Sequence, residues 1–151
     1  MAAPSTPIAY NLFKYALGKK LIDLSADTFK VALFTSASNA TTTALTHSGG
    51  TPPLYSDLTN EVSNANGYTT GGATVANTWT NSSGVETFGL ANSQWTASGA
   101  GLVWEFAVFY DSTTGHLVAW CYGDSTPASV TVAAGVQMTL TMNVAGLFSL
   151  S

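Results

Sequence analysis

The chain has 151 residues, a formal net charge of -4, and only 8% charged residues. This length is typical of one domain, so we expect a single domain spanning residues 1–151. No arginine occurs and no lysine follows Lys30, so the chain lacks the numerous basic residues on which nucleic-acid binding depends.

The remaining polar residues are mostly Thr, Ser, Asn and Gly, and a surface so poor in charge favours close packing against neighbouring proteins. The N-terminus lacks the pattern of a signal peptide. Residues 101–110 form the longest apolar stretch, which Glu105 interrupts and which is shorter than the roughly 20 residues of a membrane helix. Cys121 is the only cysteine, and no Cys/His spacing matches a zinc site. We therefore expect no membrane association, no metal and no cofactor.

The first predicted element is a helix within an N-terminal arm, residues 1–24. Thr6 is placed to cap it, and Pro7 is placed at its first position, where the missing N–H costs nothing. An apolar stripe at helical spacing follows, made of Ile8, Leu12, Phe13, Ala16, Leu17 and Leu21. Residues 28–36 then alternate in the manner of a strand.

Residues 36–56 form a long polar loop with almost nothing to contribute to a core. A loop of this length inside a domain is usually functional or ordered by a partner.

The rest of the chain is predicted to be strands separated by turns. Residues 73–80 and 85–91 flank one turn, residues 101–110 and 116–122 flank another, and residues 136–144 alternate between apolar and polar. This pattern indicates a mainly β protein, a single-domain antiparallel β-sandwich or a barrel-like variant of it. The segment 101–110 is apolar on both faces, so we expect it to be the central strand. Its aromatic residues and those of its partner strand should lie in the core: Trp104, Phe106 and Trp120.

A glycine cluster at Gly67, Gly71 and Gly72 invites comparison with a phosphate-binding loop. The cluster has neither the lysine nor the strand-loop-helix context that such a loop needs. We interpret it as a structural corner, where glycine permits unusual dihedral angles or close backbone approach.

The sequence offers few candidates for catalysis. His47, His116 and Cys121 lack a nucleophile elbow; a turn histidine is usually solvated and a mid-strand cysteine is usually buried and inert. Glu105 is a conceivable glycosidase acid with a raised pKa, but no second carboxylate can be paired with it. The alternative is that the Glu105 side chain points to an edge or an interface and finds a hydrogen-bond partner. We expect no catalytic residues and no enzymatic activity.

Three stretches, "IDLSADTFKVALFTS", "YSDLTNEVSNANGYTTGGATVAN" and "AVFYDSTTGHLVAW", precede a closing "GLFSLS". In this order they resemble a family of small proteins encoded among the virion structural genes of tailed bacteriophages and prophages. The resemblance extends from the first helix to the C-terminus. It implies a virion protein that is made in the bacterial cytoplasm.

Our leading hypothesis is a capsid decoration, or cement, protein on the outer surface of a phage head. Its partner would be the major capsid protein, and symmetry makes a homo-oligomer plausible. The candidate contact residues are Lys14, Lys19, Lys20, Tyr55 and Tyr68. The alternatives are a tail, baseplate or fibre component that binds host-surface glycans and, more remotely, a glycan hydrolase.

Overall fold

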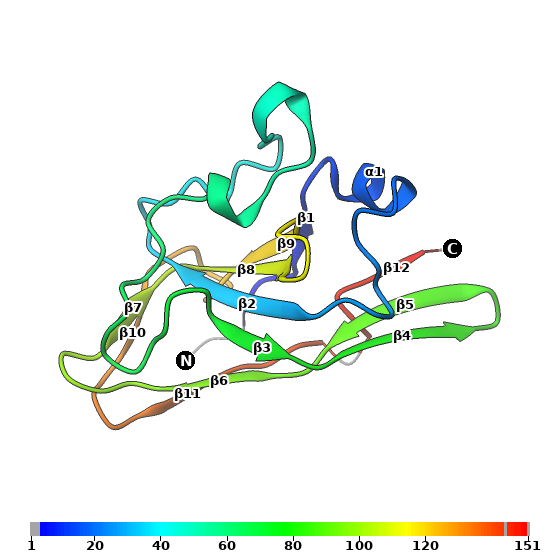
Figure 1. The fold of residues 1–151 in the computed structure, drawn as a ribbon. Coiled ribbons are helices and arrows are strands. Elements are labelled where there is room, and N and C mark those ends of the chain that lie inside the picture. Colours follow the sequence, from blue (N-terminus) through cyan, green and yellow to red (C-terminus); the bar gives the residue numbers. More distant parts are fainter. Residues whose placement is uncertain (1–3, 144, 151) are drawn as a thin grey trace.

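The computed structural model describes residues 4–143 and 145–150, and it is mainly β with one α-helix (Figure 1). Antiparallel strands form two layers, as expected of a β-sandwich, and none of the sheets formed by these residues closes into a barrel. The first elements in chain order are β1 (Ile8–Ala9), α1 (Phe13–Gly18), β2 (Phe29–Phe34), the 3-10 helices η1 (Ser48–Gly50) and η2 (Tyr55–Asp57), β3 (Ala73–Val75), β4 (Asn77–Ser82) and β5 (Val85–Leu90). The later elements are β6 (Ser93–Thr96), β7 (Leu102–Trp104), β8 (Phe106–Asp111), β9 (Leu117–Tyr122), β10 (Val130–Val132), β11 (Gln137–Leu140) and β12 (Phe148–Leu150).

The first layer is a five-stranded sheet in the order β1-β9-β8-β2-β3. Strand β8 is its central strand and is buried along its whole length, which explains why its sequence is apolar on both faces. The predicted single strand 101–110 is two strands, because the chain passes from the second layer, where β7 pairs with β10, to the five-stranded sheet at Glu105. There the Glu105 N–H donates to the carbonyl of Phe34 at 2.8 Å, and only the second part, β8, is central.

The second layer is a long antiparallel ribbon that is interrupted twice. Strands β5, β6 and β7 follow one another along the chain and pair, in reverse order, with β12, β11 and β10. Strand β4 adds to the outer side of β5. A buried edge-to-face pair, Phe29 on β2 and Phe88 on β5, joins the two layers with ring centroids 4.9 Å apart.

The core predictions for the aromatic residues are confirmed: Trp104, Phe106 and Trp120 are all buried. The predicted turns at 81–84 and 111–115 also join paired strands, β4 to β5 and β8 to β9. The predicted strand 136–144 is shorter, because β11 ends at Leu140; Val144 lies outside the described residues.

The predicted N-terminal helix is wrong in its first half. Ile8 and Ala9 form β1, which pairs with β9 through the register Ile8–Trp120, and α1 begins only at Phe13. The Tyr10 N–H extends the pairing by donating to the carbonyl of Val118 at 3.1 Å. Pairing with the open edge of β9 satisfies backbone groups of both segments, and this outweighs the local helical pattern.

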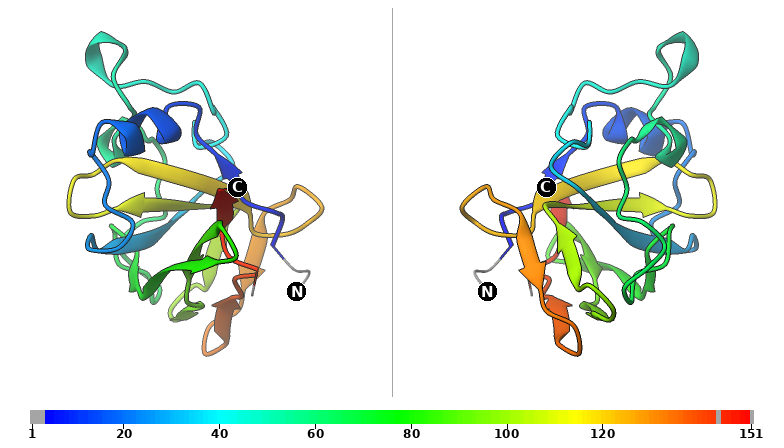
Figure 2. Two further views of the ribbon diagram at one scale, coloured as in Figure 1. Left: turned by 90° about the vertical axis from the view of Figure 1, so that its right-hand side faces the viewer. Right: turned by 90° about the vertical axis from the view of Figure 1, so that its left-hand side faces the viewer.

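The loop 36–56 was expected to hold almost nothing of a core, and this expectation is wrong. The segment lies across the outer face of the five-stranded sheet, on the side away from the second layer (Figure 2). Ala40 is fully buried there, and Leu45 and Tyr55 pack on the same cluster. The buried Tyr10 hydroxyl donates to the Ala40 carbonyl at 2.8 Å. The sheet of the same chain therefore supplies the apolar surface that the loop sequence lacks.

Candidate functional site

Three of the four lysines lie together on α1 and the turn that follows it. Lys14, Lys19 and Lys20 are all exposed, and the Lys19 ammonium lies 5.5 Å from the ring centroid of Tyr15, which is 53% exposed. Within residues 4–143 and 145–150 the one salt bridge is between His47 and Asp57, so these lysines form no ion pair there. We call Lys14, Lys19 and Lys20 the lysine surface.

The backbone conformation of the turn after α1 determines the direction of the Lys20 side chain. The Lys20 N–H donates to the carbonyl of Leu17, and the Leu21 N–H donates to the carbonyl of Ala16, at 3.0 and 2.9 Å. These two bonds form a Schellman motif, in which the residue after the helix cap takes the left-handed conformation. Lys20 has φ of +57° and occupies the position that glycine usually fills.

Lys20 also lines a pocket of about 520 Å³ between the end of α1 and the outer strands of the second layer. The pocket lining is Leu17, Lys20, Ile22, Asp23, Leu24, Ser25, Trp79 and Leu150. Its size is that of a small-molecule site, and it combines an apolar floor with one ammonium and one carboxylate.

Two groups in this pocket, the Asp23 carboxylate and the Trp79 indole N–H, remain able to form hydrogen bonds with a ligand. One oxygen of Asp23 accepts hydrogen bonds from the Ser25 hydroxyl, the Ser25 N–H and the Ala26 N–H, at 2.6, 2.9 and 3.1 Å. The Ser25 side-chain bond and then its backbone bond lower the Asp23 pKa, so the side chain is a carboxylate at neutral pH. Trp79 is half-buried, and its indole N–H donates no hydrogen bond to the described residues.

Tyr68 is buried, with 2% of its surface exposed, and so offers no surface to a partner. Its hydroxyl donates to Oε1 of Glu61 at 2.6 Å and accepts from the Leu33 N–H at 3.0 Å. The Gly71 N–H donates to the same Glu61 oxygen at 2.7 Å. The side chain is therefore a structural link between β2 and the glycine corner.

Tyr55, the second aromatic candidate, reaches the same carboxylate from η2. Its hydroxyl donates to Oε2 of Glu61, and its half-buried ring stacks on Tyr110 with centroids 4.5 Å apart. The Tyr110 hydroxyl in turn donates to the Gly71 carbonyl at 2.8 Å. Tyr55, Tyr68, Tyr110 and Glu61 together form what we call the tyrosine–glutamate cluster.

This cluster is suited to holding the structure together rather than to proton transfer. Burial, and then the hydrogen bond to Glu61, raises the pKa of both Tyr55 and Tyr68 far above the ordinary value. Burial also raises the pKa of Tyr110 to about 12. All three phenols therefore stay protonated at neutral pH and act as hydrogen-bond donors, not as bases or nucleophiles.

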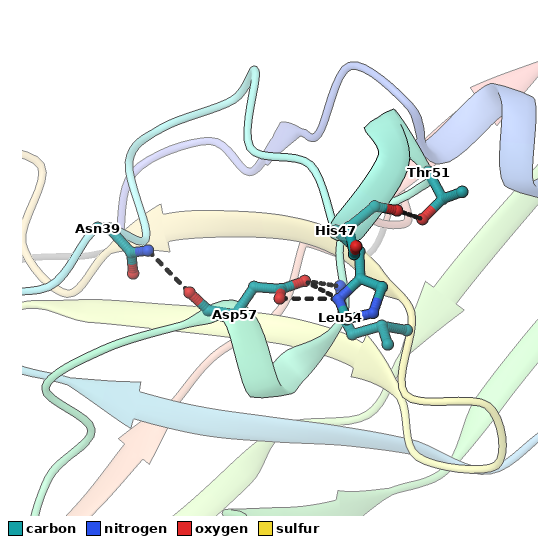
Figure 3. Close-up of polar contacts among 6 residues, drawn as sticks. Asn39, His47, Thr51, Leu54 and Asp57 are labelled. Atoms are coloured by element: carbon teal, nitrogen blue, oxygen red, sulfur yellow. Dashed lines mark hydrogen bonds and ion pairs between the residues drawn. The ribbon is translucent and has the colours of Figure 1, made fainter.

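The loop over the sheet contains a His47–Asp57 pair (Figure 3). His47 Nδ1 lies 2.9 and 3.1 Å from the two Asp57 oxygens, and the Leu54 N–H also donates to Asp57, at 2.8 Å. Asn39 donates to the Asp57 carbonyl at 2.9 Å. In the described part of the chain no side chain hydrogen-bonds His47 Nε2, so the pair lacks the hydroxyl or thiol that a catalytic triad requires.

The other catalytic candidates occupy structural positions. Cys121 is buried, and burial raises the pKa of its thiol to about 12, so it is not a nucleophile at neutral pH. His116 is half-buried rather than fully solvated, because the segment before η2 covers it through a bridge to Leu54. Glu105 accepts a hydrogen bond from the Ser129 hydroxyl at 3.0 Å, so it has the hydrogen-bond partner that the alternative to a catalytic role expected.

Asp111 is a carboxyl group with a shifted pKa that no motif in the sequence signals. Asp111 has no exposed surface; burial, followed by a hydrogen bond and charge repulsion from Asp27, raises its pKa. It accepts hydrogen bonds from the Thr113 N–H at 2.7 Å and the Thr114 hydroxyl at 2.6 Å, and so closes the β8–β9 turn. Among the described residues no group of three or more His, Cys, Asp or Glu side chains is placed to hold a metal ion.

The glycine corner is confirmed as structural. Gly67, Gly71 and Gly72 all have positive φ, between +72° and +93°. A Cβ added to Gly72 would lie 1.9 Å from the carbonyl oxygen of Val31, and one added to Gly67 would lie equally close to that of Thr96. The corner thus lets two backbone segments pass against each other where no side chain fits.

Comparison with known proteins adds no relative: no family model, no curated protein and no solved structure matches the chain. None of the described helices is long and apolar enough to cross a membrane.

Proposed function

We propose that this chain is a non-enzymatic structural protein of a phage virion, and that it decorates and stabilises the head by binding the major capsid protein. The observation that carries the proposal is the lysine surface: Lys14, Lys19 and Lys20 project from one short segment and form no salt bridge within the described residues.

The distribution of charge over the chain determines the orientation in which the lysine surface would meet a partner. The chain carries eight acidic residues and only one further lysine, the half-buried Lys30 on β2. A net-negative molecule with one positive face is attracted to an acidic partner in one orientation and repelled in the others. An acidic shell protein would thus be met by α1 and its following turn, with the exposed Tyr15 ring beside the ammonium groups.

Neutralising the lysine surface tests this proposal. A triple variant, Lys14→Gln, Lys19→Gln and Lys20→Gln, is added to expanded heads that lack the protein, and bound copies are counted by gel densitometry and electron microscopy. Occupancy should fall, with the loss largest at low salt because exposed charges are screened over about 10 Å at 0.1 M.

The matched control carries the same net charge in another place. Ser125→Glu, Ala128→Glu and Ala134→Glu lie at exposed positions before and after β10, away from α1, and should leave occupancy unchanged. Equal occupancy of the lysine variant and the wild type would refute docking through α1. Labelling of tail tips instead of heads would refute the decoration role.

A second candidate function rests on the pocket beside Trp79. A tail or fibre component that binds host-surface glycans needs an aromatic face with hydrogen-bonding groups around it, and this pocket offers Trp79, the Asp23 carboxylate and the Lys20 ammonium.

Trp79 provides its own optical readout for that candidate. The other three tryptophans, Trp95, Trp104 and Trp120, are at most 7% exposed, so acrylamide quenching of fluorescence reports mainly on Trp79. Glucose, N-acetylglucosamine and glucuronic acid serve as probes. Saturable protection by any of them would support glycan binding; no protection by all three would refute it for these sugars.

A further inference from the structure

Strand β4 (Asn77–Ser82) is the longest strand that lies at an edge of the described sheets. It pairs with β5 on one side, and Figure 1 shows no labelled strand on its other side. The other edge strands named in the two main sheets, β1, β3 and β12, have two or three residues. Short edge strands resist pairing with another chain, and β4 lacks that protection.

Three further protective devices are absent from β4. Its sequence, "NTWTNS", contains no charge and no proline, and its register with β5 runs without a bulge from Asn77–Leu90 to Ser82–Val85. Proteins usually protect an exposed edge with a lysine, a proline or a bulge. The surrounding surface is exposed too, because Thr80, Asn81 and Ser82 all face solvent.

The hydrogen-bond phase of the hairpin shows which backbone groups point outward. The Ala91 N–H donates to the Ala76 carbonyl at 2.8 Å, so Ala76 faces β5. In an antiparallel pair every second residue faces the partner, which directs the backbone groups of Thr78, Thr80 and Ser82 toward β5 as well. The N–H and C=O groups that point away from β5 then belong to the residues between them: Asn77, Trp79 and Asn81. None of these groups has a backbone hydrogen bond to another element of the described chain.

We propose that β4 pairs antiparallel with β4 of a second copy of this chain, about a two-fold axis at Trp79. This register places Trp79 opposite Trp79 and Asn77 opposite Asn81 of the other copy, and it uses all three outward-facing residues. The strand itself carries no charge, so no like charges on β4 lie opposite each other in the pair. A two-fold contact of this kind closes on itself and leaves no further edge of β4 open.

The first test removes one outward N–H. Asn81→Pro deletes a donor that the β4–β5 pairing does not use, and proline is tolerated on the open side of an edge strand. Sedimentation analysis over a concentration series should show a wild-type dimer, and Asn81→Pro should raise its dissociation constant at least about tenfold, because one hydrogen bond is lost in each half of the symmetric pair. Asn81→Ala keeps the N–H and should remain dimeric. Circular dichroism and thermal melting establish that each variant folds.

The second test fixes the register without relying on proline. In the proposed dimer Thr78 lies opposite Thr80 of the other copy at a pair with Cα atoms about 4.5 Å apart, which is within disulfide range. The double variant Thr78→Cys and Thr80→Cys should form a covalent dimer on oxidation. Thr78→Cys alone has no facing cysteine and should not, and the native Cys121 is buried.

Several outcomes would overturn the proposal. They are a wild-type monomer at all concentrations, a dimer that Asn81→Pro leaves intact, or equal cross-linking of the single and double cysteine variants. If the wild type is monomeric but Asn81→Pro loses binding to heads, the open edge of β4 pairs with a strand of another virion protein and not with a second copy of this chain. These measurements use the isolated protein, so they can fail or succeed independently of the decoration role.

Discussion

The hydroxyl of Tyr68 lies 2.6 Å from Oε1 of Glu61, and this bond connects a residue inside the sandwich to the chain that crosses its outer face. The second oxygen of the same carboxylate accepts from Tyr55 on η2. The Glu61 side chain thus connects η2, at the end of the loop that covers the five-stranded sheet, to the glycine corner and, through Tyr68, to β2.

Replacing Glu61 should loosen this arrangement. Glu61→Gln leaves one acceptor oxygen where the carboxylate uses two, so we expect a loss of about 1 to 3 kcal/mol in the free energy of unfolding, measured by urea denaturation. The control is Glu86→Gln on β5, whose carboxylate accepts from the Asn81 amide at the exposed hairpin; it should change stability by less than about 0.5 kcal/mol. Equal effects of the two variants would contradict the role given to the cluster.

The glycine corner allows a steric effect to be separated from a conformational one. Gly72 and Gly84 both have positive φ, but only Gly72 has a backbone oxygen, that of Val31, in the place of a Cβ. Gly84→Ala should therefore cost only the left-handed penalty of about 1 to 2 kcal/mol. Gly72→Ala should cost more than about 3 kcal/mol or prevent folding, as judged by soluble yield and denaturation. A similar cost at both positions would show that the close approach at Gly72 is unimportant.

Lys20 should be replaceable by glycine with a gain in stability. Its φ of +57° is unfavourable for a lysine, and glycine at this position of a Schellman motif removes that strain, for a gain of about 0.5 to 1 kcal/mol. The melting temperature should rise, while the binding to heads that we propose should weaken because one positive charge is lost. Lys19→Gly, at φ of -87°, is the comparison that loses the same charge and should not gain stability.

Asp111 predicts a definite sign of pH dependence. Its pKa is raised by burial and by the neighbouring Asp27, so the folded state binds a proton more tightly than the unfolded state does. The stabilising effect of protonation is fully present below the unfolded pKa and is lost as the pH rises through the folded pKa. Relative to Asp111→Asn, the wild type should therefore gain stability on acidification from neutral pH toward the ordinary carboxyl range. Chemical denaturation at several pH values measures this difference; a constant difference would contradict the assignment.

The sequence predicts the strands well where a local pattern and burial agree. The alternation in 28–36 and the two hairpin turns needed no knowledge of distant residues, and β2, β5 and β9 lie within the predicted strands. The predicted strand 73–80 is instead two strands, β3 and β4, which belong to different layers, just as 101–110 is divided into β7 and β8. The helix prediction failed for residues 6–12 because a distant partner, β9, decides their conformation. The prediction for the loop 36–56 failed for the same reason, because the apolar residues that it contacts belong to the sheet.

The candidate site was harder to predict, because its parts come together only in three dimensions. The lysine surface could be read from the clustering of Lys14, Lys19 and Lys20, but not the left-handed turn that directs Lys20. Glu61 belongs to no recognisable sequence motif, so the sequence does not indicate that Tyr55 and Tyr68 both hydrogen-bond to it. Trp79 likewise becomes a pocket residue only when the end of α1 folds over β4.

The interrupted ribbon of the second layer has a consequence for the order of folding. Its pair nearest in sequence is Trp104 with Val130, and its most distant pair is Glu86 with Leu150. If β7 and β10 meet first, each later pairing closes only a short additional loop, so the entropic cost of reaching the distant end is spread over small steps. The ribbon should therefore assemble like a zipper from β7–β10 toward β5–β12, and hydrogen exchange during refolding should protect Trp104 before Phe88.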